Sequence, residues 1–124
     1  MKSYVLVTGG LGYIGSHTAV ALHEQGMDLV LVDDLSNANP QMWSNLCELT
    51  QKELIWERLD LADYMQCKKL FERYHFNGVI HFAAFKAVGE SVEEPLKYYH
   101  NNLSSLLNVM KCMKNFGVLA MIFS

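Results

Sequence analysis

The sequence predicts an α/β fold in which a parallel β-sheet carries helices on both faces. Two observations support this fold class. Strand-like and helix-like segments alternate along all 124 residues, which favours parallel strands joined by right-handed crossovers. The central strand-like segments, such as residues 79–82 (VIHF), are almost continuously apolar, as is typical of a sheet covered on both faces. We therefore expect one doubly wound domain with a parallel sheet.

Apolar runs and apolar periodicity give the expected order of the elements. Apolar runs bounded by glycine, proline or polar residues predict strands at residues 3–8, 28–33, 54–59, 77–82 and 118–123. Longer segments with apolar residues at helical spacing predict helices at residues 13–25, 41–50, 63–75 and 96–115.

The last predicted helix has two apolar faces. One is a stripe at intervals of three and four, which we expect to pack on the sheet: Leu103, Leu106, Leu107, Met110 and Met113. The other is a second apolar edge, expected to be free for a contact with another subunit: Val109, Cys112 and Phe116.

Composition excludes several classes of protein. The net charge of −3 is not basic enough to favour nucleic acid as a partner, and no apolar run is long enough to span a membrane. The first strand is expected to begin at residue 3, which leaves no room for a signal peptide. Cys47, Cys67 and Cys112 are widely spaced, which favours free thiols in a reducing compartment. We expect a cytoplasmic protein.

A glycine-rich turn follows the first strand and opens a helix. In residues 8–15 (TGGLGYIG), Gly9, Gly12 and Gly15 fit the T-G-x-x-G-x-x-G pattern, whereas Gly10, Gly12 and Gly15 fit G-x-G-x-x-G. A helix N-terminus offers free backbone N–H groups and the positive end of the helix dipole. Glycine has no Cβ to block the approach of a pyrophosphate. The turn therefore predicts a dinucleotide site in a Rossmann-type sheet.

The second predicted strand ends at an acidic residue. Asp33 lies 18 residues beyond Gly15, where an acid would bind the adenosine ribose hydroxyls. Asp34 follows, and no lysine or arginine lies between Asp33 and Gln41. Two carboxylates without a cation would repel a 2′-phosphate, so NAD is favoured over NADP. The alternative is that Asp33 is a simple turn or cap residue.

Two further strand ends carry candidate binding residues. Asp60 could accept a hydrogen bond from the adenine amino group, and Leu61 could pack beside the ring. Alternatively, Asp60 caps the next helix, for which Asp63 is an equally good candidate. Lys86 lies in a loop of small residues after the fourth strand and would project towards the negative or ribose portion of the cofactor.

Two patterns that could carry chemistry are interpreted as ordinary. Tyr64 and Lys68 have the Tyr-x-x-x-Lys spacing with which short-chain dehydrogenases form a general base. They follow the third strand, on the adenine side of the fold, so we interpret them as residues of the helix surface. The histidines show no metal-ligand spacing, and no metal site is expected.

Three segments together resemble the UDP-glucose 4-epimerases, of the extended short-chain dehydrogenase/reductase superfamily. They are residues 8–17 (TGGLGYIGSH), 81–92 (HFAAFKAVGESV) and 95–102 (PLKYYHNN). The likeness covers the whole chain, and its KAVGES run is much more specific than the glycine motif. The resemblance implies interconversion of UDP-glucose and UDP-galactose through a 4-keto sugar, with NAD as cofactor.

The resemblance also implies a set of residues that contact NAD. They are Gly9, Gly12, Tyr13, Ile14, Gly15, Asp33, Asn37, Asp60, Leu61, Phe82, Ala83, Ala84, Lys86 and Asn101. Tyr13 and Ile14 would lie against the pyrophosphate through their backbone, and Asn37 would assist Asp33. Phe82 and the residues after it would run beneath the nicotinamide half. Lys86 would reach the nicotinamide ribose and face the substrate, and Asn101 would support the same region.

Catalytic residues of the family have no counterpart in residues 1–124. The resemblance places the family's Tyr-x-x-x-Lys pair and its UDP-sugar domain beyond the position of Ser124. We expect an incomplete NAD-binding domain that is inactive alone, from an enzyme that forms a homodimer through the 96–115 helix. One alternative is a sister enzyme, such as a UDP-N-acetylhexosamine 4-epimerase or a UDP-glucuronate decarboxylase. Another is a non-catalytic NAD-binding module that pairs with a complete subunit.

Overall fold

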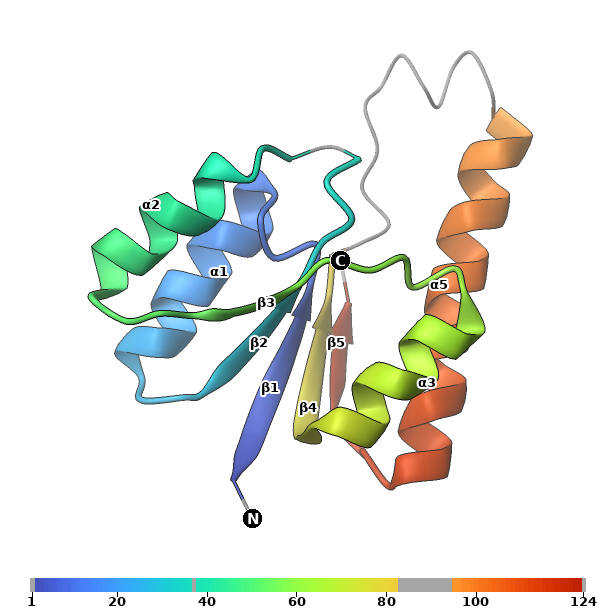
Figure 1. Cartoon of the computed structure of the whole chain (residues 1–124). Coiled ribbons are helices and arrows are strands. Elements are labelled where there is room, and N and C mark those ends of the chain that lie inside the picture. Colours follow the sequence, from blue (N-terminus) through green and yellow to red (C-terminus); the bar gives the residue numbers. More distant parts are fainter. Residues whose placement is uncertain (1, 37, 83–94, 124) are drawn as a thin grey trace.

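The computed structural model describes residues 2–36, 38–82 and 95–123 and contains a five-stranded sheet in the order β3-β2-β1-β4-β5 (Figure 1). Neighbouring strands pair in parallel throughout. The elements are β1 (Ser3–Thr8), α1 (Tyr13–Glu24), β2 (Leu29–Val32), α2 (Gln41–Thr50), β3 (Ile55–Glu57), α3 (Tyr64–Arg73), β4 (His75–His81), α5 (Pro95–Phe116) and β5 (Met121–Phe123). The predicted Rossmann-type, doubly wound sheet is confirmed.

Helices cover both faces of the sheet. Figure 1 shows α1 and α2 on one face and α3 and α5 on the other. Leu6 and Val7 are adjacent in β1 and both fully buried, yet Leu6 belongs to the core under α3 and α5 and Val7 to the core under α1 and α2. Because side chains alternate along a strand, a strand with helices on both faces buries successive side chains in different cores, which explains its nearly continuous apolar run.

The edge strands are shorter than predicted. β3 and β5 each contain three residues, because among the described residues each pairs with one neighbouring strand and the pairing covers three positions. In contrast, β4 begins at His75, before its predicted start, because His75 pairs with Ser3 of β1. The third helix therefore ends at Arg73 rather than at residue 75.

The prediction that the apolar stripe of the last helix packs on the sheet is wrong for three of its five residues. In α5, Leu103, Leu107 and Met110 are exposed to 56%, 53% and 50%. The edge that we expected to be free is instead the buried one, because Val109 and Cys112 are fully buried in the core. Both faces of this helix are apolar, so periodicity could not show which of them meets the sheet. Other members fall between these extremes: Met113 is buried, Leu106 is half-buried, and Phe116 is exposed.

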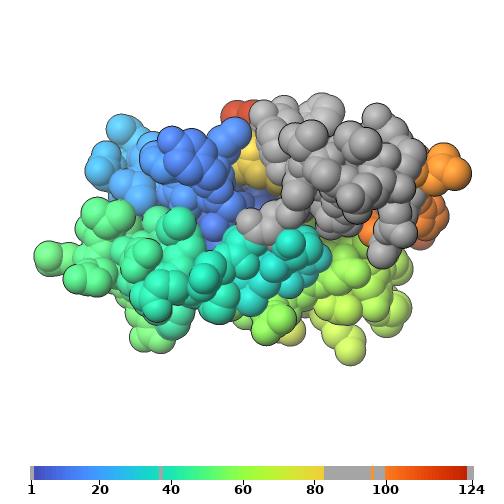
Figure 2. All heavy atoms as spheres, turned by 90° about the horizontal axis from the view of Figure 1, so that it is seen from above, coloured from blue at the N-terminus to red at the C-terminus, as the bar shows by residue number. Residues whose placement is uncertain are grey.

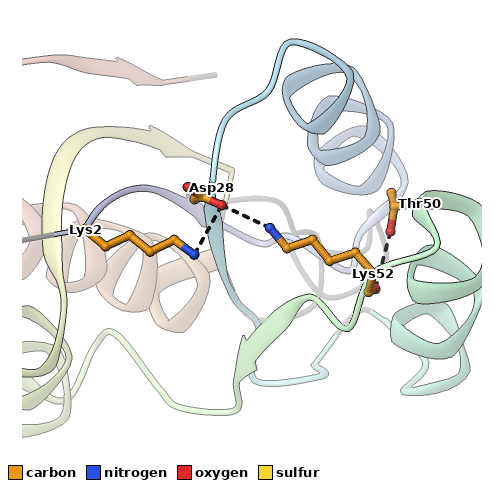
Figure 3. Close-up of polar contacts among 4 residues, drawn as sticks. All are labelled: Lys2, Asp28, Thr50 and Lys52. Carbon is orange, nitrogen blue, oxygen red and sulfur yellow. Dashed lines mark hydrogen bonds and ion pairs between the residues drawn. The ribbon is translucent and has the colours of Figure 1, made fainter.

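A small charged cluster lies at the amino ends of β1 and β2, at the opposite end of the sheet from the carboxyl ends of the strands. The Asp28 carboxylate lies 3.0 Å from Lys52 Nζ and 3.6 Å from Lys2 Nζ (Figure 3). The hydrogen bond from Lys52 is the main reason that the pKa of Asp28 lies below its usual value. Ion pairs as exposed as these add little to stability.

No helix in the described part of the chain is long and apolar enough to cross a membrane.

Candidate functional site

A pocket lies at the carboxyl ends of the strands, the edge of the molecule seen from above in Figure 2. Its walls come from the glycine turn, the segment after β2, the loop after β3, the end of β4 and the first half of α5. The described residues that line it are Gly9, Gly12, Val32, Asp33, Asp34, Ser36, Ala38, Leu59, Asp60, Leu61, Phe82, Asn101, Asn102 and Ser105. Ligands of doubly wound folds bind at this edge.

The glycine turn packs directly against α1. Gly9 has a φ of 64°, and its carbonyl oxygen accepts a hydrogen bond from Gly12 N–H at 3.0 Å. A Cβ at Gly15 would lie 2.1 Å from the Gly9 carbonyl oxygen, so α1 reaches this position only with glycine there. Gly12, the N-cap of α1, has no side chain to cap the helix. The first N–H groups of α1 therefore remain available to an anion.

The Asp33 carboxylate links the end of β2 to the glycine turn. It is 9% exposed, and its oxygens accept hydrogen bonds from Leu11 N–H at 3.1 Å and from Leu35 N–H at 2.8 Å. Trp56 Nε1–H donates to the Asp33 carbonyl at 3.2 Å. Burial raises the pKa of Asp33, and the two backbone hydrogen bonds oppose part of that rise. Each carboxylate oxygen has a second lone pair, so Asp33 can also accept hydroxyl groups of a ligand.

The pocket is acidic at the same end. Asp34 is exposed beside Asp33, and its carboxylate accepts hydrogen bonds from the backbone and side chain of Ser36 at 2.9 and 2.8 Å. No lysine or arginine occurs among the described residues that line the pocket. This charge distribution suits ribose hydroxyls and disfavours an additional phosphate.

The structure decides which of the two candidate residues in the loop after β3 caps α3. Asp63 is the N-cap of α3, because its carboxylate accepts hydrogen bonds from Met65 N–H at 3.0 Å and Gln66 N–H at 3.5 Å. Asp60 instead accepts a hydrogen bond from Ala62 N–H at 2.9 Å and lines the pocket with the buried Leu61. The alternative of Asp60 as the cap is therefore wrong.

A buried histidine fixes the end of β4. His81 is fully buried, and its Nδ1 lies 2.8 Å from Thr8 Oγ1, which also accepts a hydrogen bond from Phe82 N–H at 2.9 Å. Among the described residues, His81 Nε2 has no hydrogen-bond partner. Burial lowers the pKa of His81 to about 4. At neutral pH the imidazole is therefore uncharged and holds the point where the chain leaves β4 beside the pocket.

The structure brings many of the predicted site residues together. Those that line the pocket are Gly9, Gly12, Asp33, Asp60, Leu61, Phe82 and Asn101. Tyr13 and Ile14 lie in the first turn of α1 with exposed side chains, and Gly15 packs beneath the turn. The predicted contacts at Asn37, Ala83, Ala84 and Lys86 lie outside the described residues.

The pocket also contains residues that the sequence interpretation missed. Ser105 is buried and donates a hydrogen bond to the Asn101 carbonyl at 2.9 Å, one helical turn away. Its spacing of four from Asn101 could have identified it, because such residues share a helix face. Leu59 and Asn102 also line the pocket, but no sequence pattern had identified them. Tyr64 and Lys68 are not among the pocket residues, and Tyr64 lies instead under the ammonium of Lys111 at 4.5 Å.

Known proteins have similar sequences and similar folds. Residues 6–123 match the family model described as GDP-mannose 4,6 dehydratase. UDP-glucose 4-epimerase uge1 of Schizosaccharomyces pombe is 48% identical over 120 residues, which cover 97% of this chain and 34% of that protein. The UDP-glucose 4-epimerase of Bacillus subtilis is 45% identical over 120 residues, covering 97% and 35%.

Solved structures agree with these relatives. UDP-glucose 4-epimerase from Bifidobacterium longum, in complex with NAD+ and UDP, superposes with a TM-score of 0.92 at 40% identity, covering 98% of this chain and 36% of that one. The UDP-Glc/GlcNAc 4-epimerase from Campylobacter jejuni gives a TM-score of 0.88 at 36% identity, with coverage of 98% and 36%. The chain thus spans about a third of the length of these relatives. Because the family model covers almost every residue, the chain belongs to the family described as GDP-mannose 4,6 dehydratase, and it is similar to the N-terminal third of UDP-glucose 4-epimerases.

Proposed function

We propose that the chain is the NAD-binding part of a UDP-glucose 4-epimerase, which interconverts UDP-glucose and UDP-galactose in the cytoplasm. The observation that carries this proposal is the Asp33 carboxylate, which lines the pocket and accepts hydrogen bonds from Leu11 N–H of the glycine turn and from Leu35 N–H. A glycine turn that opens a helix, with a buried acid beside it, suits the pyrophosphate and ribose of a dinucleotide. The similarity to epimerases, one of them solved with NAD+ and UDP, supports the choice of reaction.

The residues present fit NAD. Because Gly15 has no Cβ, the glycine turn packs closely against α1, and the first N–H groups of α1 remain accessible to a pyrophosphate. In this proposal, the backbone of Tyr13 and Ile14 binds the pyrophosphate, and Asp33 with Asn37 binds the adenosine ribose. Asp60 and Leu61 frame adenine. The nicotinamide half lies against the remaining proposed residues: Phe82, Ala83, Ala84, Lys86 and Asn101.

Bound NAD would supply the oxidation at the sugar C4 position and the return of the hydride. This chain's residues would bind and orient the cofactor, and Lys86 would also face the sugar nucleotide. We assign no catalytic residue within positions 1–124, and we expect this domain to need the remainder of an epimerase for turnover. The test of the function is therefore product analysis with UDP-glucose on an enzyme that carries this domain together with that remainder.

A sister activity is the second candidate, because the Campylobacter jejuni neighbour is a UDP-Glc/GlcNAc 4-epimerase. Product analysis with UDP-glucose and with UDP-N-acetylglucosamine separates the two. Conversion of the N-acetylated sugar at a comparable rate would contradict a strict UDP-glucose 4-epimerase.

Replacing Asp33 with alanine is expected to weaken NAD binding about 10- to 100-fold, because hydrogen bonds to a charged carboxylate contribute about 1.5–3 kcal/mol. Preference for NAD over NADP is expected to shrink, since the charge that repels a 2′-phosphate is removed. Isothermal titration calorimetry with both dinucleotides measures this. The control is Asp28→Asn, at the opposite end of the sheet. Unchanged NAD affinity in a folded Asp33→Ala protein would contradict the assigned role.

The exposed stripe of α5, formed by Leu103, Leu107 and Met110, is proposed as the homodimer contact. Leu107→Glu is expected to raise the dimer dissociation constant at least about 10-fold, because two copies of an apolar contact residue become charged. Sedimentation velocity over a concentration series measures it. The control, Met65→Glu, changes an equally exposed residue, which is 55% exposed on α3. A wild-type chain that stays monomeric at high concentration would contradict this contact.

A further inference from the structure

The loop that carries Asp60 and Leu61 is held from two sides. Towards α3, Asp60 N–H donates to Gln66 Oε1 at 3.0 Å, and within the loop Ala62 N–H donates to the Asp60 carboxylate at 2.9 Å. Towards α5, Asn108 Nδ2 donates to the carbonyls of Leu61 at 2.9 Å and Ala62 at 3.1 Å. The first two bonds are local. The Asn108 bonds span 47 and 46 residues and form only when α5 is docked.

These two hydrogen bonds connect the two elements that form two walls of the pocket. Leu61 belongs to the wall from the loop after β3, and Asn101, Asn102 and Ser105 belong to the wall from α5. Asn108 is on the same helix, two turns beyond Asn101, and is not itself among the lining residues. An amide NH₂ group has two hydrogens, so Asn108 can hold both carbonyls at once.

We propose that Asn108 is a positioning residue for the cofactor. It sets the distance between α5 and the loop that carries Asp60 and Leu61. The inference rests on the proposed function, in which this pocket binds NAD. Without the amide, the loop keeps its hydrogen bond to α3 but loses both of its hydrogen bonds to α5, so its spacing from that helix is less well fixed. A ligand that touches both walls would then have to restore their spacing on binding, and its affinity would fall.

A neighbouring contact offers a matched control. Lys111, one turn beyond Asn108, places its ammonium 4.5 Å from the centre of the Tyr64 ring. This contact also ties α5 to α3, but it does not reach the loop carbonyls. Lys111→Met therefore removes one contact between α5 and α3 but leaves the two hydrogen bonds from Asn108 to the loop. Comparing it with Asn108→Leu distinguishes an effect of weaker helix docking from an effect of the loop position.

The experiment is calorimetric titration of ADP and NAD into the whole chain, as wild type, Asn108→Leu, Asn108→Gln and Lys111→Met. Circular dichroism verifies at the same temperature that each protein is folded. Asn108→Leu is expected to weaken NAD binding about 10-fold, because NAD must then restore the spacing of the two walls. ADP binding is expected to weaken less, because ADP lacks the nicotinamide half that is proposed to lie against Asn101 of α5. Asn108→Gln keeps the NH₂ donor and is expected to recover part of the affinity, and Lys111→Met is expected to bind as wild type does.

The outcomes distinguish this inference from the proposed function. If the wild type binds neither ADP nor NAD, the proposed function fails and this inference falls with it. If the wild type binds and folded Asn108→Leu binds equally well, the positioning role alone is overturned. The same holds if Lys111→Met loses as much affinity, because any weakening of α5 docking would then suffice. Should Asn108→Leu fail to fold, Asn108→Ser, which is too short to reach both carbonyls, carries the same test.

Discussion

Replacing Gly15 with alanine is expected to abolish detectable NAD binding and to lower the free energy of unfolding by about 3 kcal/mol or more. The added Cβ would lie 2.1 Å from the Gly9 carbonyl oxygen and 2.9 Å from its carbonyl carbon. Both are backbone atoms, so the clash is relieved only if α1 moves away from the glycine turn. That movement would carry off the N–H groups proposed to bind the pyrophosphate. Urea unfolding and calorimetric titration with NAD measure the two effects.

Gly78→Ala in β4 is the matched control for this substitution. A Cβ at Gly78 would meet Ala120 at 3.8 and 3.9 Å, which is ordinary contact, so stability is expected to change by at most about 0.5 kcal/mol. NAD binding is expected to be unchanged. A Gly15→Ala protein with wild-type stability and affinity would show that α1 does not pack on the turn as described.

Acidification from pH 7 to pH 4.5 is expected to remove about 2 kcal/mol of stability through His81. Burial lowers the pKa of His81 from 6.5 to about 4, so the unfolded chain binds a proton that the folded chain excludes. Stability from the neutral imidazole is therefore present above pH 6.5 and is lost as the pH falls from 6.5 towards 4. Urea unfolding of the wild type and His81→Asn across this range measures it.

Comparing the wild type with His81→Asn separates the contribution of His81 to the pH dependence of stability from that of the other titratable groups. Asp33 has a raised pKa, so its protonation favours the folded state at low pH and opposes the His81 effect. His81→Asn offers an amide to Thr8 in place of Nδ1 and has no group that titrates between pH 4 and 6.5. The variant is expected to be less stable at pH 7 but to lose less stability on acidification. Equal slopes in both proteins would contradict the assignment.

Much of the fold and the site followed from local sequence. Strand order aside, the alternation of apolar runs and helical periodicities located every described element within a few residues, because each pattern depends on near neighbours along the chain. The glycine turn and Asp33 were identified in the same way, because their spacing along the chain fits the pattern of a dinucleotide site. NAD binding at the individual residues stays a prediction that the proposed titrations test.

Tertiary structure alone decided which of several equivalent local choices was used. Asp60 and Asp63 are equally good caps by sequence, and only the position of α3 assigned the cap to Asp63 and left Asp60 at the pocket. The buried face of α5 was another such choice, because both of its faces are apolar. The face with Val109 and Cys112 meets the core, and on that helix Asn108 reaches two carbonyls of a loop 46 and 47 residues away. Burial and long-range hydrogen bonds depend on partners from distant elements, which no local pattern encodes.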